Sequence, residues 1–489
     1  MDIHHLLDKS TALQVSMVEY LYHEGGRASI NELMAVFQLS LPTIQELVET
    51  FQLSYEDKNE LICIVQNEST VVLETMQYFD SKRLLREQVR KSLAYRLLLE
   101  HLEDSDRDIY HFTFKFQISE EQYVEEVSRL NRLLTEFELS LENGQIVGDE
   151  LQIRYFFFQL LWVTQSYENS VTELTTEQMV IRQLEKTFQR SFSTEVHQKI
   201  ALYLEIFSKR RKKRGIFYAE ITPEEEATIS PEVLKLIKEA LAIYSERYAL
   251  TIETFELKSF YFFLCTINIF SSRDDISYLI YEQNYEEATL IDQMNDLVFT
   301  YLRKHGFFDQ ESNRALWMEV TSLMFSLHFN VLKYSGWIEG YDAENHQITT
   351  EFDAHARAIA KEVRLFAAIF RKNVLPEQVF IDGYKNVLLL IQKRKNKKIK
   401  IGISFTRESE SNQTFEGIVS SFFQENEAVE IGAYLADHSY DLVINDHVMP
   451  KDPIVDRYIT VPEIPTEFSI NELTKLLQEL ADQTGVSRL

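Results

Sequence analysis

The segment of this chain that most restricts its fold is residues 119–147. Ser119 stands three residues before Gln122, the spacing at which two side chains cap the start of a helix reciprocally. Apolar residues then recur at intervals of three and four on one helical face, at Tyr123, Val127, Leu130, Leu134 and Phe137. Behind them, Asn143-Gly144 divides two short alternating runs, which is a strong signal for a β-hairpin. A capped amphipathic helix followed at once by a hairpin is typical of the end of a winged helix-turn-helix unit.

The helices needed to complete this unit are predicted directly before it, at residues 91–102 and 109–116. A similar order occurs near the start of the chain. It comprises a helix at 13–24, a second helix opened by a capping box at Ser29 and Glu32, a third beginning at Leu41-Pro42, and a hairpin with strands at 52–54 and 61–65. The sequence therefore predicts two winged units in tandem.

The middle of the chain, residues 166–394, is nearly all amphipathic helix and looks duplicated. Only 13 Gly and 8 Pro occur in 489 residues, which leaves little material for turns and favours long helices. Residues 177–179 have a counterpart in 292–294, and residues 195–196 have one in 319–320. Repetition of this kind predicts two helical bundles of roughly 110 residues each.

After a charged linker at residues 393–398, the pattern changes to strands that alternate with helices. Strands are predicted at 399–405, 430–434, 442–444 and 458–461, and helices at 415–424 and 471–480. Such alternation predicts a small α/β domain with a four-stranded, mostly parallel sheet. The expected fold is therefore mainly α and multidomain, with two winged helix-turn-helix domains, two helical bundles and this C-terminal α/β domain.

Charge and composition exclude several classes of protein. The chain has 50 Lys and Arg against 77 Asp and Glu, a net charge of -27, so any contact with nucleic acid has to be local. It has no signal peptide and no apolar run of the roughly 20 residues that span a bilayer. Two widely separated cysteines form neither a disulfide framework nor a metal site, and Gly-rich phosphate loops and zinc motifs are missing. We therefore expect a cytoplasmic protein that is not an enzyme, with no cofactor, no metal and no membrane contact.

Residues 139–162, which begin Leu-Ser-Leu-Glu-Asn-Gly and end Phe-Phe-Phe-Gln-Leu-Leu-Trp, resemble the wing and the following helix of the Mga and AtxA transcriptional regulators. Residues 118–137 resemble the recognition helix of the second DNA-binding domain in that family. The resemblance implies a regulator that binds double-stranded DNA, forms homodimers and is controlled through phosphorylation by phosphotransferase carrier proteins. It also implies five domains, namely two winged helix-turn-helix domains at 1–70 and 71–165, two phosphotransferase-system regulatory domains at 166–285 and 286–395, and an enzyme IIB-like domain at 396–489.

A recognition helix reads base edges in the major groove with outward residues of its N-terminal half. In the second winged unit we expect these residues to be Gln122, Glu125, Ser128, Arg129 and Arg132. Arginine suits phosphate or guanine, glutamine suits adenine, and glutamate can accept from cytosine. The alternative is a solvated face, because the acids that crowd the start of this helix also favour the helix dipole.

Two further sets of residues are candidates for DNA contact. In the first recognition helix they are Thr43 and Gln45, on a stretch that carries no Lys or Arg. Between the winged units a basic set recurs at helical spacing, at Lys82, Arg83, Arg86, Arg90 and Lys91. These cations either neutralise phosphates or pair with acids on a solvated helix. The densest basic run, residues 209–214, follows a predicted helix, and we expect it to have a structural or interdomain role.

Histidine is the phosphate acceptor in the regulatory domains that the middle of the chain resembles, and a neutral imidazole nitrogen can attack a phosphoryl group. His197 is the first candidate because it lies beside the first repeated Glu-Val pair. The second repeat has Thr321 in that place, which leaves His305 and His328 as candidates there. Each of these histidines can also be a structural side chain. The phosphate-accepting cysteine of enzyme IIB has no counterpart in residues 404–409, so we expect no phosphocarrier activity.

Two other functions remain open from the sequence. The acidic recognition helices also fit a regulator that works through protein contacts, with winged units that no longer bind DNA strongly. An RNA-binding antiterminator would share the regulatory bundles. Such a protein would begin with a small β module, whereas this chain begins with helices.

Overall fold

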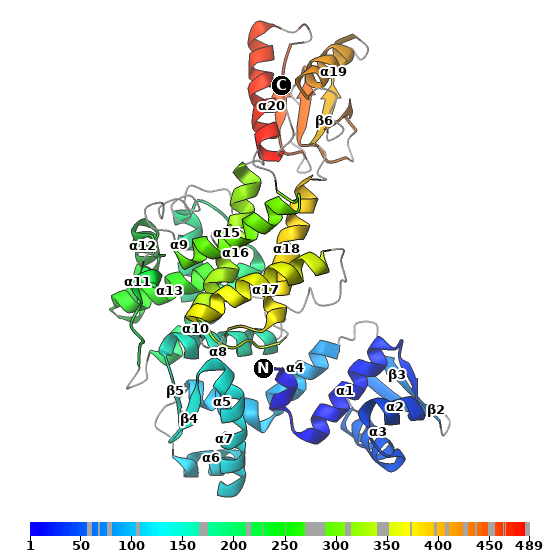
Figure 1. Ribbon diagram of the computed structural model, residues 1–489, viewed down its shortest axis with the longest axis vertical. Helices are drawn as coiled ribbons and strands as arrows, with labels where there is room; N and C mark the ends of the chain where they lie inside the picture. The colour runs from blue at the N-terminus through cyan, green and yellow to red at the C-terminus, as the bar shows by residue number, and fades with distance from the viewer. Residues whose placement is uncertain are drawn as a thin grey trace.

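A computed structural model arranges the parts of the chain along one long axis (Figure 1). The winged units lie at one end, the helical bundles in the middle and the α/β domain at the other end. The structure describes residues 1–55, 61–66, 69–75, 81–103, 108–165, 175–211, 217–226, 228–249, 251–267, 269, 289–308, 314–339, 352–371, 374–395, 399–405, 410–423, 429–435, 438–447, 455–462, 464 and 466–484.

The first winged unit combines helices with a three-stranded antiparallel sheet of order β1-β3-β2. Its elements are η1 (Ile3–Leu6), α1 (Lys9–His23), β1 (Arg27–Ser29), α2 (Ile30–Phe37), α3 (Leu41–Tyr55), β2 (Leu61–Gln66) and β3 (Thr70–Thr75). Ser29 and Glu32 form the predicted capping box at the start of α2. Their reciprocal hydrogen bonds satisfy two backbone N–H groups that the helix leaves without partners.

The hairpin predicted for this unit is wrong in its first strand. Residues 52–54 continue α3, because they extend the helical repeat that already buries Ile44 and Phe51. β2 pairs instead with β3, in which Val71 and Leu73 alternate toward the core. The wing of the first unit is therefore built by β2 and β3.

The second winged unit follows the predicted order closely. It consists of α5 (Leu93–Glu103), α6 (Ile109–Phe116), α7 (Glu120–Leu134), η2 (Thr135–Phe137), β4 (Ser140–Glu142) and β5 (Gln145–Val147), and it lies between α4 (Ser81–Lys91) and α8 (Glu150–Thr164). Asn143 and Gly144 have φ angles of 50° and 75°, which the tight turn between β4 and β5 requires. The helix predicted over 91–102 is interrupted at Ser92, whose hydroxyl accepts the Tyr95 N–H at 3.2 Å and so caps α5.

Two helical bundles follow. The first contains α9 (Thr176–Thr187), α10 (Thr194–Arg210), α11 (Pro223–Glu226), α12 (Pro231–Tyr248) and α13 (Thr254–Thr266). The second contains α15 (Leu290–Lys304), α16 (Arg314–Lys333), α17 (Asp353–Phe370) and α18 (Glu377–Lys395). α9 packs on α10 and α12, and α15 packs on the corresponding α16 and α17. Both α9 and α15 begin with a threonine capping box, at Thr175 and Thr289.

The C-terminal part is an α/β domain with a four-stranded sheet in the order β7-β6-β8-β9. Its elements are β6 (Ile399–Ser404), α19 (Glu410–Phe423), β7 (Val429–Ala433), β8 (Leu442–Asn445), β9 (Tyr458–Thr460) and α20 (Glu467–Thr484). Neighbouring strands are parallel at every described pairing, so the sheet is more uniform than the mostly parallel one expected. Residues 406–409, most of the loop compared with the enzyme IIB cysteine site, lie outside the described residues.

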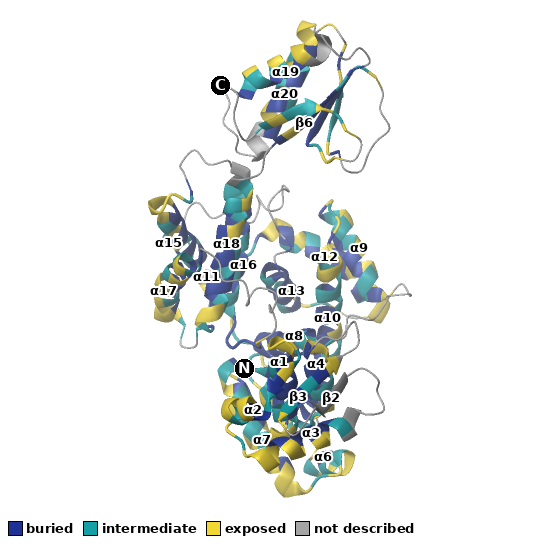
Figure 2. Ribbon diagram, turned by 90° about the vertical axis from the view of Figure 1, so that its right-hand side faces the viewer, coloured by how far each residue is buried: buried dark blue, intermediate teal, exposed yellow. Residues whose placement is uncertain are grey.

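The buried core runs without a break from the first winged unit into the first bundle. Helix α8 carries this continuity, because it is buried on nearly all sides and contributes Phe156, Phe157 and Phe158 (Figure 2). The same core includes Phe325 and Phe329 of α16, while most of the second bundle and the α/β domain have cores of their own. Within the described part of the chain, every helix is too short or too polar to cross a membrane.

Candidate nucleic-acid interface

Helix α7 presents the outward residues expected of a second recognition helix. Ser119 caps it, and the Ser119 N–H donates to Oε1 of Gln122 at 2.9 Å while the Gln122 N–H donates to the serine hydroxyl at 3.1 Å. Tyr123, Leu130 and Leu134 are buried on the inner face. The opposite face is exposed along Gln122, Glu125, Ser128 and Arg132. Figure 2 shows exposed stretches on α7. Groove residues are therefore accessible, although the side-chain oxygen of Gln122 is already used by the cap.

Arg129 differs from its neighbours on α7 because it has partners inside the molecule. Its Nε donates to Glu126 Oε2 at 3.0 Å, and its Nη1 donates to the carbonyl of His5. A longer contact of 3.5 Å reaches the carbonyl of Leu7. The guanidinium thus fastens the segment before α1 to α7, and we assign Arg129 a structural role in place of the DNA contact expected from the sequence.

Arg132 is the cation of α7 that stays accessible. It is exposed, and it forms no ion pair or hydrogen bond with any residue that the structure describes. Near the start of the same helix Glu120, Glu121 and Glu125 are also exposed, so this end of α7 carries a negative field. Contact with phosphates along α7 therefore depends on Arg132.

The basic set on α4 divides into two groups. Lys82, Arg83 and Lys91 are exposed, and Arg83 Nε lies 3.3 Å from Glu87 Oε1 one turn further along. Arg90 is half-buried and donates through Nε to the carbonyl of Thr164 at the end of α8. Arg90 is therefore a structural residue that holds α4 against α8, whereas the exposed members remain candidates for phosphate contact together with the half-buried Arg86.

In the first winged unit, Thr43 and Gln45 are both exposed on α3. The Thr43 hydroxyl lies 2.8 Å from that of Ser40, and this hydrogen bond stabilises the start of the helix. Glu46 and Glu49 are exposed on the same helix. This face is accessible but carries no positive charge of its own.

His197 lies in the first turn of α10 and is half-exposed. Its Nε2 is 2.9 Å from Oε1 of Glu185, and its ring meets Phe192 edge-on at a centroid distance of 6.3 Å. Partial burial favours a raised pKa for the Glu185 carboxyl, but hydrogen bonds from the Phe192 N–H and from His197 outweigh it and lower this pKa. A carboxylate in this position orients the imidazole ring.

The other two candidate histidines lie in contrasting places. His305 is exposed after α15, where its ring stacks on Tyr301 at a centroid distance of 4.2 Å. His328 on α16 is completely buried, and its two ring nitrogens lie 2.8 Å from Asn295 Oδ1 and 2.8 Å from Tyr384 Oη. Burial lowers the pKa of His328 to about 3, so the ring is neutral. His328 is out of reach of a phosphoryl donor, which corrects its assignment as a candidate acceptor.

Sequence reasoning missed a buried ion network that joins the second winged unit to the first bundle. Arg154 on α8 donates to Glu150 at 2.9 Å and makes a bidentate contact with Glu256 on α13 at 2.5 and 3.0 Å. Arg210 at the end of α10 donates to the second oxygen of Glu150 at 2.6 Å. Tyr218 adds a hydrogen bond of 2.9 Å to Glu256. The expected interdomain role of the 209–214 run holds for Arg210, while residues 212–214 lie outside the described residues.

A second connection is made by residues 334–339, which follow α16. The side chain of Gln152 bonds to both the N–H and the carbonyl of Ser335, at 3.0 and 2.7 Å. The Ile338 N–H donates to Gln159 at 2.7 Å, and the Trp337 N–H donates to Glu136 at 3.0 Å. These contacts could have been expected from the polar residues spaced through the apolar run of α8. Polar groups inside a fully buried helix need hydrogen-bond partners.

These winged-unit elements were compared with known proteins and protein families. No curated protein matches the chain. The model of the Mga helix-turn-helix domain matches residues 77–161, a segment that spans the described helices from α4 into α8 together with the β4–β5 wing. This part of the chain is therefore similar to the Mga helix-turn-helix domain, which points to a DNA-binding regulator.

Proposed function

We propose that the chain is a transcriptional regulator that binds double-stranded DNA through its winged units, with α7 in the major groove. The observation that carries the proposal is the exposed outer face of α7 within the segment that matches the Mga helix-turn-helix domain. A helix of 15 residues with one buried face and a wing beside it has the form that enters a groove. Glu125 and Ser128 are the residues placed to meet base edges.

The charge distribution limits how this contact is made. Acidic residues at the start of α7 repel phosphates, so the helix depends on Arg132 and on flanking cations of α4 such as Lys82 and Arg83. Each phosphate neutralised adds about 0.9 to the slope of log affinity against log salt. With few cations available, we expect binding with a shallow salt dependence.

Replacing Arg132 by alanine is expected to weaken DNA binding about tenfold and to reduce the salt slope by about one. Electrophoretic mobility shifts with intergenic DNA at several salt concentrations measure both quantities. Arg357→Ala is the matched control, because Arg357 is an exposed arginine on α17 and belongs to neither winged unit. Equal affinity and slope for Arg132→Ala and the parent protein would count against groove binding by α7.

We further infer that His197 is the site at which phosphotransferase carrier proteins control the regulator. With the ring proton on Nε2 and donated to Glu185, Nδ1 presents its lone pair to a phosphoryl donor. The half-exposed position in the first turn of α10 leaves the ring accessible. Homodimers that place paired winged units on DNA would be the state that this modification adjusts.

His197→Ala is expected to abolish the uptake of radioactive phosphate from a phosphorylated carrier protein, because the attacking nitrogen is lost. Glu185→Gln is expected to slow uptake, because a neutral amide orients the ring without stabilising its charge. Phosphate transfer to the full chain, followed by gel autoradiography, measures both rates. His305→Ala serves as the control and should keep the parent rate, so full labelling of His197→Ala would refute the assignment.

A protein-binding role is the second candidate, and one observation favours it. Tyr110 and Phe114 on α6 are 70% and 88% exposed, and Val124 on α7, the next helix, is 58% exposed. Large apolar side chains this exposed are typical of contact surfaces. Recovery of a stable partner by the full chain in the absence of DNA, and its loss in Phe114→Ser, would support this role over DNA binding.

A further inference from the structure

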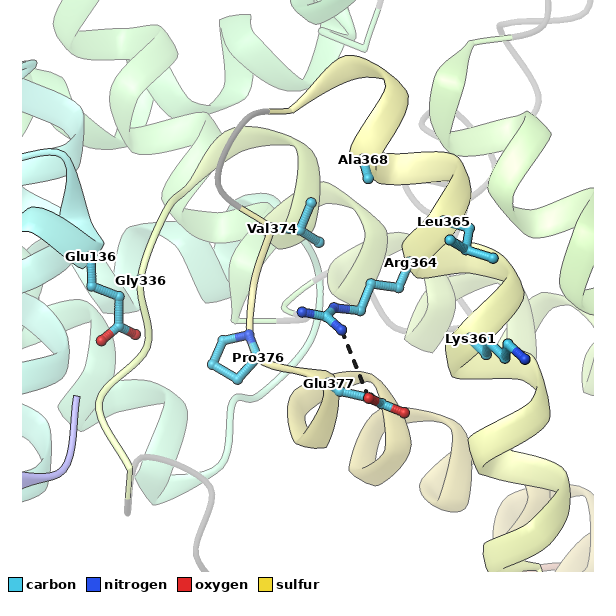
Figure 3. A pocket seen from close by; sticks show the side chains of 9 residues that line it. All are labelled: Glu136, Gly336, Lys361, Arg364, Leu365, Ala368, Val374, Pro376 and Glu377. Atoms are coloured by element: carbon cyan, nitrogen blue, oxygen red, sulfur yellow. Dashed lines mark ion pairs between the residues drawn. The ribbon is translucent and has the colours of Figure 1, made fainter.

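A cavity of about 570 Å³ lies where the second winged unit meets the second bundle (Figure 3). Its walls come from three parts of the chain: Glu136 of η2, Gly336 of the 334–339 segment, and residues of α17 and the start of α18. Figure 3 shows Arg364 extending from α17 between Val374 and Pro376, with Glu136 on the far side. Ligand sites are commonly cavities of this size, roughly 300–1,000 Å³, and often lie between domains.

Two cations, Arg364 and Lys361, are the positively charged residues of the cavity. Nε of Arg364 is buried and has no hydrogen-bond partner among the residues that the structure describes. Its Nη1 forms an ion pair with Glu377, 3.7 Å from Oε2, without reaching hydrogen-bond distance. Lys361 lines the cavity one helical turn before Arg364 and adds a second positive charge. These donors are matched to an anionic group, because guanidinium groups bind carboxylate and phosphate with charge-assisted hydrogen bonds.

The carboxylate of Glu136 does not compete for Arg364. It accepts from the Trp337 N–H at 3.0 Å and lies 2.7 Å from the Met1 nitrogen, so both of its oxygens are engaged. The charge of Glu136 is therefore offset within the winged unit and the 334–339 segment. Arg364 and Lys361 are the cations that line the cavity on the α17 side, where Glu377 pairs with Arg364.

The remaining wall is apolar. Leu365, Ala368, Val374 and Pro376 line it, and Leu365 is 64% exposed although it is a large aliphatic side chain. Apolar surface beside a few converging polar groups is the usual composition of a site for a small organic molecule. A ligand that covers Leu365 removes apolar surface from water at the same time as its charged group reaches Arg364.

We propose that this cavity binds a small organic anion, with a phosphate or carboxylate group on Arg364 and an apolar body against Leu365, Val374 and Pro376. The site is independent of the proposed DNA contact, because its test is direct binding. Its position gives it a consequence for regulation. Gly336 has a φ of +76°, and a Cβ there would lie 2.6 Å from the ring of Phe137, so the 334–339 segment is held tightly on the winged unit. A molecule in the cavity therefore contacts winged unit and bundle together.

Isothermal titration calorimetry on the full chain tests the proposal with phenyl phosphate and phenylacetate, and with benzyl alcohol as the neutral probe. We expect saturable binding of at least one of the two anions with a dissociation constant below about 10 mM, and none of the alcohol. Arg364→Gln should weaken binding about tenfold or more, because it removes the charged guanidinium group that contacts the anion. Ala368→Trp should abolish it by filling the cavity. Arg357→Gln, an exposed arginine on the same helix outside the cavity, should bind as the parent does.

The outcomes distinguish a phosphate ester from a carboxylic acid, and they also identify the results that would contradict the proposal. Preference for phenyl phosphate assigns the site to a phosphate ester, and preference for phenylacetate assigns it to a carboxylic acid. Benzyl alcohol binding as tightly as the anions would overturn the role of Arg364. The site itself would be overturned if neither anion saturates, or if both Arg364→Gln and Ala368→Trp bind like the parent. Circular dichroism of each variant establishes that it is folded.

Discussion

Replacing Arg154 by methionine is expected to lower the free energy of unfolding of the winged units and first bundle by about 3–5 kcal/mol. The side chain is completely buried and bridges Glu150 on its own helix to Glu256 on α13. Methionine fills a similar volume but leaves Glu256, among the described residues, with the hydroxyl of Tyr218 as its one partner. An uncompensated carboxylate in a buried site is costly because desolvation is no longer offset by an opposite charge. Urea unfolding followed by hydrogen exchange in α8 and α13 measures the loss.

The comparison variants separate charge from packing. Arg154→Met combined with Glu256→Gln removes one charge of each sign and leaves the Glu150–Arg210 pair intact. We expect this double variant to be more stable than the sum of the single changes by about 1 kcal/mol or more, since the residues interact directly. Arg83→Met breaks an exposed pair with Glu87 and should cost less than about 0.5 kcal/mol. A loss for Arg154→Met as small as that for Arg83→Met would show that the network contributes little.

The same network bears on how regulation would reach the winged units. α8 ends the segment similar to the Mga helix-turn-helix domain, and its Arg154 is tied to α13 while its Glu150 is tied to α10. α10 also carries His197 in its first turn. A change of charge at His197 therefore acts on a helix whose far end is hydrogen-bonded to α8. This is a physical connection between the two proposed sites, and it runs through the Glu150–Arg210 pair.

The parts of the fold that the sequence predicted best are those set by local interactions. The capping boxes at Ser29 and Ser119 and the turn at Asn143-Gly144 depend on residues a few positions apart, and all three are present. The first wing was assigned wrongly at residues 52–54 because a short polar stretch after a helix fits either a strand or another helical turn. Only pairing with β3, a tertiary contact, decides between them.

The candidate sites were predicted less well, and the reason is again distance along the chain. The helical period predicts which residues of α7 point outward, and Arg132 is exposed as expected. Whether an outward arginine can contact a ligand depends on the distant segments that pack against it. Arg129 donates a hydrogen bond to the carbonyl of His5, which is 124 residues away. Arg90 likewise donates a hydrogen bond to the carbonyl of Thr164. Arg154 bonds to Glu256, which is 102 residues away, so the buried ion network cannot be predicted from a local sequence pattern.

Acidification is expected to destabilise the second bundle through His328, the buried histidine that sequence reasoning proposed as a phosphate acceptor. Burial lowers its pKa in the folded protein to about 3, from an ordinary value of 6.5. As the pH falls below 6.5, the unfolded chain takes up a proton that the folded chain does not. The stability that the neutral ring provides is therefore complete above about pH 6.5 and is lost toward pH 3, at about 1.4 kcal/mol per pH unit.

Urea unfolding at pH 7, 6 and 5, followed by hydrogen exchange in α16 and α18, measures this slope. His328→Gln keeps a neutral polar group between Asn295 and Tyr384 and should give a shallower slope between pH 6 and 5, by about 1 kcal/mol, even though it lowers stability at pH 7. His23→Gln, at an exposed position on α1, controls for the loss of a histidine. If His328→Gln keeps the parent slope, His328 does not govern the acid response. A shallower slope confirms a histidine held neutral inside the bundle, where its ring nitrogens are hydrogen-bonded to Asn295 and Tyr384.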